Sequence, residues 1–523
     1  MKRYPSIFND ALAPVTPGPS SSNTCGPARI ARTCRRLFGE KPCRVELRMS
    51  NAGNYKPSFL GMRTDLAFLT GFLDRDVTHP RFIHAHADAE AEGIVMETIY
   101  TDDLPGFPTA LAEIVLCGES GRKMSFHTVS CGGGAFNIDA VNGCRVMITG
   151  ECYETLLFVS PVFTIFDESM LKSKIRGFLS LYRETPTSAV LEIKSTYSLS
   201  ADAVNMLRNT SGVEFVASAE PIHPVVPGVG KEPPFTTSAE FIQYADGNRI
   251  PLWEAAIEYE SSISGWSRDE ILSRASALWK TVLQSVEGGL MPGNDMNGIT
   301  HAVAPRVKKG FESKKLIPLG AINVGAPVAL SIMEYSNCSG VVVCIPTGGS
   351  SGVVPGAILG AAGELNKSEE ECVRAFLVAG LMGVFMEKTH YLGSYGCQME
   401  IGLAAGMASA GLIEMLGGTA AQASSAAVMC LQSLSGILCD KIAGLVQVPC
   451  LSRNMTATAI AMVCANAAMC GVETLVPLEE KMDSMMIVGK KLIDEGINRM
   501  GDMGTPTGKR LATEQKMRDA KLR

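Results

Sequence analysis

The stretch LCDKIAGLVQVPCLSRN, residues 438–454, holds two cysteines among glycine, proline, aspartate and asparagine residues that are typical of the ends of helices and strands. A third cysteine, Cys397, lies upstream in GCQME. Three thiolates are able to hold three irons of a [4Fe-4S] cube and leave the fourth iron open as a Lewis acid. We therefore predict that Cys397, Cys439 and Cys450 are metal ligands. Their spacing, C-x41-C-x10-C, matches no compact ferredoxin run, and a core role for each cysteine is the alternative.

The composition is that of a folded globular protein. The 523 residues suffice for about two to four domains, and 46% of them are hydrophobic against 19% charged. The net charge of −6 and the lack of a basic stripe in the sequence argue against a nucleic-acid partner. The first residues form no signal-like apolar run, and the apolar segments are short or rich in alanine, glycine and serine. We therefore expect a cytoplasmic protein without a membrane span, whose 16 cysteines are reduced.

Changes of pattern along the chain predict three domains and a linker. Residues 1–145 mix strand-like and helical stretches, so we expect an α+β domain. Residues 146–226 read as strand, helix, strand, helix, strand, which is typical of a ferredoxin-like α+β module of the ACT type, a kind that binds small effectors or mediates assembly. Residues 227–237 continue a stretch rich in proline and glycine and are predicted to be a linker. Residues 238–523 have helical periodicity, so we expect a large all-α domain.

Hydrophobic periodicity also predicts individual elements. Residues 44–50 and 123–129 alternate like half-buried strands, and the second runs into a glycine turn. Residues 64–73 and 168–181 have helical spacing instead.

A stretch rich in histidine and acidic residues offers a second candidate metal site. His84, His86, Asp88 and Glu90 alternate as they would on one face of a strand, and such a face is able to hold Zn²⁺ or Mn²⁺. An exposed polar strand face is the simpler interpretation, and we favour it.

Four motifs rich in glycine, serine and cysteine stand out along the chain. They are PGPSSSNTCGP at 17–27, PTGGSSGVVPG at 346–356, GCQMEIG at 396–402, and CDKIAGLVQVPC at 439–450 with Arg453 and Asn454 after it. In combination they resemble the motifs of the iron–sulfur L-serine dehydratases, with the beta and alpha portions of that family fused in one polypeptide. The resemblance is loose over the first 145 residues and closer over residues 238–500.

This resemblance implies both a fold and a reaction. The implied fold is a serine dehydratase beta-like α+β domain facing an all-α catalytic domain that binds a [4Fe-4S] cluster through the three cysteines. The implied reaction is α,β-elimination of water from a 2-amino-3-hydroxy acid, followed by hydrolysis to a 2-oxo acid and ammonia. Hydroxide is a poor leaving group and an α-proton is weakly acidic. The reaction therefore needs a Lewis acid at one end and a positioned base at the other.

Two loops are candidates for the substrate site. Ser20, Ser21, Ser22, Asn23 and Thr24 offer hydroxyl, amide and backbone N–H groups ahead of a helix expected at 28–37, which would suit a substrate carboxylate. A simple helix cap is the alternative for these residues, and the resemblance favours the substrate site.

The second loop is the glycine-rich PTGGSSG motif. It predicts a wall of backbone donors in which Thr347 and Ser350 bind substrate and Ser351 takes part in catalysis, with an ordinary glycine loop as the alternative.

The chain departs from the family pattern at positions that are expected to face the substrate. Asn23 replaces a histidine of the family loop, and Met62 and Arg63 stand where the family has two further histidines. Arg63 would be able to pair with a second carboxylate if it faces the site. Lys388 and His390 are the nearest candidates for proton transfer, although a lysine at a helix end and a surface histidine are commoner interpretations. Lys441 also replaces a proline that follows Cys-Asp in the family.

The first functional hypothesis is a [4Fe-4S]-dependent, oxygen-sensitive lyase of amino acid metabolism that acts on a small hydroxy amino acid like L-serine. A β-thiol amino acid or a hydroxy dicarboxylate as substrate, and an isomerase reaction, are alternatives on the same scaffold. The second hypothesis is a non-catalytic metabolite sensor that uses the ACT-like module. We expect a small amino or hydroxy acid as the ligand and a homodimer as the assembly, without a nucleic-acid or membrane partner.

Overall fold

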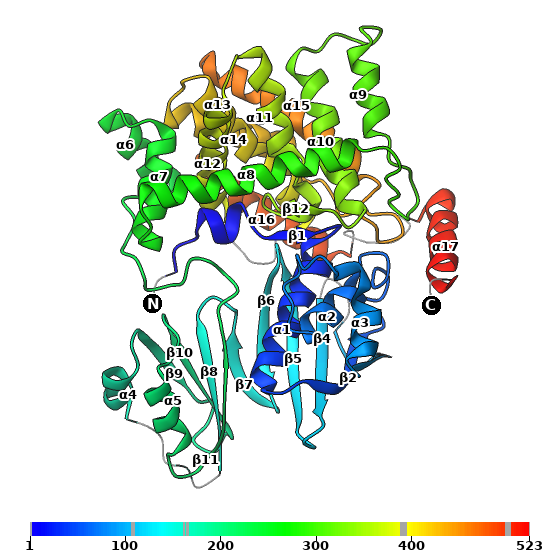
Figure 1. Cartoon of the computed structure of the whole chain (residues 1–523). Coiled ribbons are helices and arrows are strands. Elements are labelled where there is room, and N and C mark those ends of the chain that lie inside the picture. Colours follow the sequence, from blue (N-terminus) through cyan, green and yellow to red (C-terminus); the bar gives the residue numbers. More distant parts are fainter. Residues whose placement is uncertain are drawn as a thin grey trace.

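Figure 1 shows the protein as a computed structural model, which describes residues 3–105, 110–160, 163, 167–387, 395–496 and 504–521. A large helical part lies above two sheet-containing parts (Figure 1). The six-stranded sheet lies directly below the helices, and the four-stranded sheet lies beside it. The mixed α and β character expected for the first half of the chain and the helical character expected for the second are both confirmed at this level.

The six-stranded sheet has the strand order β3-β2-β4-β5-β6-β7. Only the pair β2–β3 is parallel, and the other neighbours are antiparallel. The helices α1 and α2 pack over one face, and Phe38, Phe68 and Phe126 belong to the shared core. The elements of this part are η2 (Ser21–Cys25), α1 (Gly26–Phe38), β2 (Pro42–Ser50), α2 (Thr64–Phe72), η3 (Phe82–His84), α3 (Ala85–Ala91), β3 (Val95–Thr101), β4 (Ala110–Gly118), β5 (Lys123–Gly132), β6 (Ala135–Val141) and β7 (Cys144–Ile148).

The second sheet has the order β11-β8-β10-β9 and is antiparallel throughout. With β8 (Tyr153–Val159), α4 (Glu168–Lys174), β9 (Phe178–Tyr182), β10 (Val190–Ser195), α5 (Ala201–Arg208) and β11 (Val213–Ala219), the chain runs βαββαβ, which is the ferredoxin-like arrangement. The helix predicted over 168–181 is therefore wrong in its second half. It ends at Lys174, and Gly177, with a φ of 67°, precedes the edge strand β9.

A buried ion-pair cluster joins the two sheets. The ammonium of Lys194 on β10 lies 2.6 Å from Glu154 and 2.8 Å from Glu192 and donates to the carbonyl of Met147 on β7. The N–H of Met147 donates in turn to Glu192 at 2.9 Å. Because both carboxylates are almost fully buried, these contacts fix how the smaller sheet sits against the larger one.

The helical part is built around α12 and α13, whose residues are almost all buried. The all-α expectation needs one correction, because β12 (Val341–Val343) pairs antiparallel with β1 (Val15–Pro17) from the start of the chain. The helices of this part are α6 (Ser238–Asn248), α7 (Leu252–Ser264), α8 (Arg268–Leu290), α9 (Ala304–Glu312), α10 (Ala321–Asn337), η4 (Gly348–Ser350), α11 (Val353–Glu364), α12 (Glu369–Met386), η6 (Gln398–Gly402), α13 (Leu403–Met415), α14 (Ala420–Ser433), α15 (Cys450–Met469), α16 (Leu478–Asp494) and α17 (Pro506–Lys521).

The first residues of the chain belong to the core of the helical part. Ile7, Phe8 and Leu12, in and after the turn η1 (Ile7–Ala11), are buried in the same cluster as α12. Glu260 of α7 accepts hydrogen bonds from the hydroxyl of Ser6 at 2.6 Å and from the N–H of Ile7 at 2.8 Å. The N-terminal segment is thus held between the helices and the six-stranded sheet, which brings the Ser20–Thr24 loop to their junction (Figure 1).

The strand expected at residues 84–90 is wrong, because the segment forms the turn η3 and the helix α3. His86 binds Asp65 at 2.7 Å, and Asp88 pairs with Arg75 and Arg81. His86 and Asp88 therefore have partners on other elements, and among the described residues the four side chains do not form one metal-binding face. Among the described residues, no helix has the length and apolar character needed to cross a membrane.

Burial of Glu260 predicts a pH-dependent stability. Burial raises the pKa of this carboxyl to about 7, despite its hydrogen bonds with Ser6 and Ile7. Glu260 keeps its proton up to about pH 7 in the folded protein, whereas in the unfolded chain it loses the proton near the ordinary pKa of 4.5. Its contribution to the free energy of unfolding is therefore complete below about pH 4.5 and is lost as the pH rises through about 7. Relative to Glu260→Gln, the free energy of unfolding of the wild-type protein should fall by up to about 3 kcal/mol between about pH 5 and about pH 8. Thermal melts across this range measure it, and Glu258→Gln on the same helix should leave the pH profile unchanged.

Candidate functional site

The three predicted cysteines come together in one buried environment. Cys397 precedes η6, Cys439 lies in the loop after α14, and Cys450 is the first residue of α15, and none is more than 3% exposed. The contact with the thiol of Cys439, together with burial, raises the pKa of Cys397. Burial raises the pKa of Cys450 to about 12. The three thiols thus lie close enough to alter one another's ionisation.

Polar contacts fix the segments that carry these thiols. The guanidinium of Arg453 binds Asp440 through both nitrogens, at 2.6 and 3.0 Å, and donates to the carbonyl of Leu438. It also contacts the thiol of Cys397. Gln398 accepts from the N–H of Gly436 at 2.9 Å. The Cys439 loop is therefore tied to α15 on one side and to the Cys397 turn on the other.

Two charged side chains share the environment of the thiols. Lys441 and Glu400 are each 9% exposed. Burial opposes the charged form of Lys441, but the nearby thiols and Glu400 outweigh it and raise its pKa. Its ammonium makes no hydrogen bond or ion pair with any residue that the structure describes. A cation therefore lies among three potential thiolates without a dedicated partner, at an unfavourable desolvation cost.

The glycine-rich loop after β12 lies beside the cysteines. The hydroxyl of Thr347 donates to Oε1 of Glu400 at 2.7 Å. Asn454, one turn after Cys450, donates to the carbonyls of Gly349 at 2.8 Å and Cys450 at 2.9 Å and accepts from the N–H of Gly352 at 3.1 Å. This fully buried amide fixes the loop against the start of α15.

The serine loop of the N-terminal part reaches the same place. The N–H of Gly348 donates to the hydroxyl of Ser21 at 3.2 Å. A Cβ at Gly348 would lie 3.0 Å from the backbone nitrogen of Ser21, so the close approach of the two loops favours glycine here. The contacts run from Ser21 through Gly348 and Thr347 to Glu400, and so join the serine loop to the cysteine environment.

Most polar groups of the serine loop are used within the protein. Ser20 caps the turn η2 by accepting from the N–H of Asn23 at 3.2 Å. The amide of Asn23 donates to Ser58 at 2.9 Å and accepts from the hydroxyl of Ser22 at 3.1 Å. The hydroxyl of Thr24 donates to the carbonyl of Met62 at 2.9 Å. Helix capping therefore describes part of the loop, and Asn23 links it to the neighbouring turn.

Three of the remaining predicted site residues, Arg63, Ser350 and Ser351, have contacts that the structure describes, and two do not. The guanidinium of Arg63 is half-buried and influences the ionisation of Cys338 at the end of α10. The hydroxyls of Ser350 and Ser351 donate to loop carbonyls at 2.8 and 3.2 Å, so in this structure they support the loop. Lys388 and His390 lie outside the described residues.

Sequence reasoning did not assign roles to Glu400, Asn454 and Arg453, although they lie inside the quoted motifs. The one sequence signal for Glu400 is an acid at the start of the long apolar run 399–413.

The donor set suits an iron–sulfur cluster better than a single ion. Among the described residues, no three His, Cys, Asp or Glu side chains are arranged to hold a metal ion. A four-iron cube binds each cysteine through a different iron, so its ligands need not meet at one point. Three buried thiols supply the sulfur ligands that such a cube takes, and Lys441 nearby would offset part of their negative charge. The residues present therefore fit this group.

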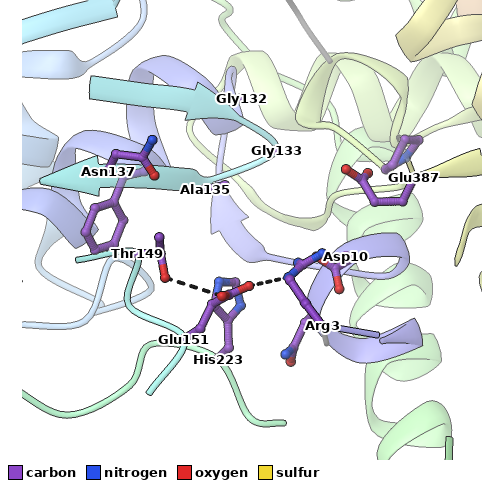
Figure 2. Close-up of a pocket in the computed structure, with 13 residues that line it drawn as sticks. Arg3, Asp10, Gly132, Gly133, Ala135, Asn137, Thr149, Glu151, His223 and Glu387 are labelled. Carbon is purple, nitrogen blue, oxygen red and sulfur yellow. Dashed lines mark hydrogen bonds and ion pairs between the residues drawn. The ribbon is translucent and has the colours of Figure 1, made fainter. Parts of the chain in front are cut away.

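A separate cavity lies where the helical part meets both sheets. Figure 2 shows Arg3 and Asp10 from the N-terminal segment, Glu151 and His223 from the ferredoxin-like side, and Glu387 across the opening. Arg3 forms ion pairs with Asp10 and Glu151, and the hydroxyl of Thr149 donates to Glu151 at 3.4 Å. Arg3 is thus held by two carboxylates, and the cavity is lined by Pro346 of the glycine-rich loop but by none of the three cysteines.

Comparisons with known proteins place the similarity on the helical part. A family model described as "Serine dehydratase alpha chain" matches residues 247–504. The probable L-serine dehydratase alpha chain of Bacillus subtilis is 29% identical over 53% of this chain and 94% of its own length. The L-serine dehydratase alpha chain of Peptoniphilus asaccharolyticus is 32% identical over 49% of this chain and 89% of its own. L-serine dehydratase TdcG of Escherichia coli is 30% identical over 50% of this chain and 59% of its own.

The hydrogen bonds of Asn454 predict a large effect on stability. Asn454→Leu would leave the carbonyl of Gly349 and the N–H of Gly352 buried without a partner, at about 1–3 kcal/mol each. The melting temperature should fall by several degrees, which differential scanning calorimetry measures. Asn466→Leu on the exposed side of the same helix is the control, and an equal loss from both variants would contradict this role of Asn454.

Proposed function

Because the chain belongs to the serine dehydratase alpha-chain family, we propose that it removes water and then ammonia from a small hydroxy amino acid such as L-serine, leaving a 2-oxo acid. Membership follows from a relative that is 32% identical over 89% of its own length and from the family model over residues 247–504. The family makes the chain a lyase. The substrate is inferred from the names of the relatives, all three of which are L-serine dehydratases or alpha chains of that enzyme.

We propose that Cys397, Cys439 and Cys450 hold a [4Fe-4S] cluster. When bound, the cluster would supply an open iron that acts as a Lewis acid and assists departure of the substrate hydroxyl. Lys441 would offset part of the negative charge of the three thiolates. Arg453 and Asp440 would hold the Cys439 segment in place.

The observation that carries this proposal is the meeting of two loops beside the cysteines. The contacts from Ser21 to Gly348 and from Thr347 to Glu400 join the serine loop, the glycine-rich loop and the cysteine environment. We assign the substrate carboxylate to the Ser20–Thr24 loop at the start of η2 and α1, with Thr347 and Ser350 in the facing wall. Ser351 supports the wall, and its predicted part in catalysis stays a prediction, as do the proton-transfer roles of Lys388 and His390.

A substrate with an additional negative charge is the second candidate. The observation that favours it is the buried ammonium of Lys441, which has no hydrogen-bonding partner among the described residues. A second carboxylate would provide one, and Arg63 at the neighbouring turn would add positive charge. The effector role of the ferredoxin-like module, the homodimer and the cytoplasmic location remain predictions from the sequence.

Turnover under anaerobic conditions tests the proposed function. Protein reconstituted with iron and sulfide is incubated with L-serine, L-threonine, L-cysteine and a hydroxy dicarboxylate, and 2-oxo acid, ammonia and sulfide are measured. We expect about four irons per chain, a broad visible absorbance and pyruvate from L-serine.

Cysteine variants provide the matched control for that assay. Cys439→Ser should lose iron and activity together, whereas Cys470→Ser, which changes an exposed cysteine, should retain both. Full iron and full activity in Cys439→Ser would show that the ligand assignment is wrong.

The charge of Lys441 predicts a specific effect on iron content. Lys441→Met removes the cation beside the three thiolates and should reduce the iron retained after gel filtration, while Lys441→Arg should largely preserve it. Lys490→Met, which removes an exposed lysine of α16, is the control. Equal iron in the methionine and arginine variants would mean that the charge of Lys441 does not support the cluster.

A further inference from the structure

Glu400 is the carboxylate that links the cysteine environment to the glycine-rich loop. It lies in η6, three residues after Cys397, and is 9% exposed. Its Oε1 accepts from the hydroxyl of Thr347 at 2.7 Å. Its negative charge influences the ionisation of Cys397, Cys439 and Cys450 alike. A substrate bound against the glycine-rich loop at Thr347 would therefore lie beside this side chain.

The second oxygen of Glu400 is available to a ligand. Oε2 makes no hydrogen bond with a described residue. The surrounding protein does not enclose it completely, so it borders open space. No cation of the described residues forms an ion pair with the carboxylate, whereas the neighbouring Asp440 is held by Arg453. Gly349 keeps the space beside Oε1 open, since a Cβ there would lie 3.4 Å from that oxygen.

The other polar side chains near the two loops are less suited to accept a proton. The amide of Asn23 is not a base, and it is bonded to Ser58 and Ser22. The hydroxyls of Ser350 and Ser351 already donate to loop carbonyls. An oriented carboxylate with one unbonded oxygen is, by contrast, an ordinary general base.

We propose that Glu400 is the catalytic base that takes the α-proton of the substrate, an inference that rests on the proposed elimination reaction. The Cα–H bond breaks and an O–H bond forms at Oε2. The electron pair left on Cα forms the Cα=Cβ bond, and the Cβ–O pair leaves with the hydroxyl group. Return of the proton from Glu400 to that hydroxyl completes a molecule of water and restores the carboxylate. The hydroxyl of Thr347 orients the base through Oε1 and is a positioning residue.

Four variants of the reconstituted full-length protein test this assignment. Glu400→Gln keeps the shape and should lower kcat by at least about 100-fold, with KM for L-serine within about threefold and iron content unchanged. In D₂O it should also lose incorporation of deuterium at C2 of recovered L-serine. Thr347→Val should lower kcat less, and Glu400→Asp should retain part of the activity. Glu414→Gln alters a half-buried carboxylate near the end of α13, the helix that follows η6, and should leave every quantity unchanged.

Other results would overturn the inference. Deuterium exchange that persists in Glu400→Gln, or a rise in KM with kcat intact, would make Glu400 a ligand of the substrate ammonium. Loss of iron from both Glu400→Gln and Thr347→Val would make the pair structural. A wild-type protein that carries its full iron but converts no hydroxy or thiol amino acid would overturn the proposed function, and this inference with it. Normal wild-type turnover with an active Glu400→Gln would overturn the inference alone.

Discussion

Burial of three thiols from separate segments is the constraint around which the site is arranged. Cys397, Cys439 and Cys450 are almost inaccessible, and an ionised sulfur at such a depth is costly unless charge or hydrogen bonds compensate it. The fold supplies that compensation locally. Lys441 lies among the thiols, and Arg453 contacts Cys397 while its charge is matched by Asp440. The segments are thus held by their own polar contacts as well as by the thiols.

The second constraint is that the first residues of the chain pack against elements of its second half. The pairing of β1 with β12, the burial of Ile7 and Phe8 among the helices, and the contact between Ser21 and Gly348 place residues more than 300 positions apart side by side. No local pattern specifies such contacts, because periodicity reports which face of an element is buried and not what covers it. The N-terminal segment therefore packs with the helices although it is distant from them in the sequence.

The elements that the sequence predicted well are those with one buried face. Residues 44–50 and 123–129 alternate because β2 and β5 are covered by helices on one side only, and both strands are present. The errors arise where short polar elements lie at the surface. Residues 84–90 alternate in polarity yet form η3 and α3, because the residues between the polar ones are alanines, which favour a helix. The motifs singled out the three cysteines that the fold brings together, whereas no motif predicted the contact between Glu400 and Thr347, 53 positions away.

Asn23, which stands where the resembled family has a histidine, has a structural role in this protein. Both ends of its amide are bonded inside the protein, to Ser58 and to Ser22, so the position serves to join the serine loop to the turn that carries Met62 and Arg63. A neutral amide used in this way is not available for proton transfer. The N-terminal loop then contributes backbone and hydroxyl groups, which suit a carboxylate. In the proposed reaction, acid–base chemistry would fall to the helical part, where the family match lies and where Glu400 and Lys441 influence the ionisation of the thiols.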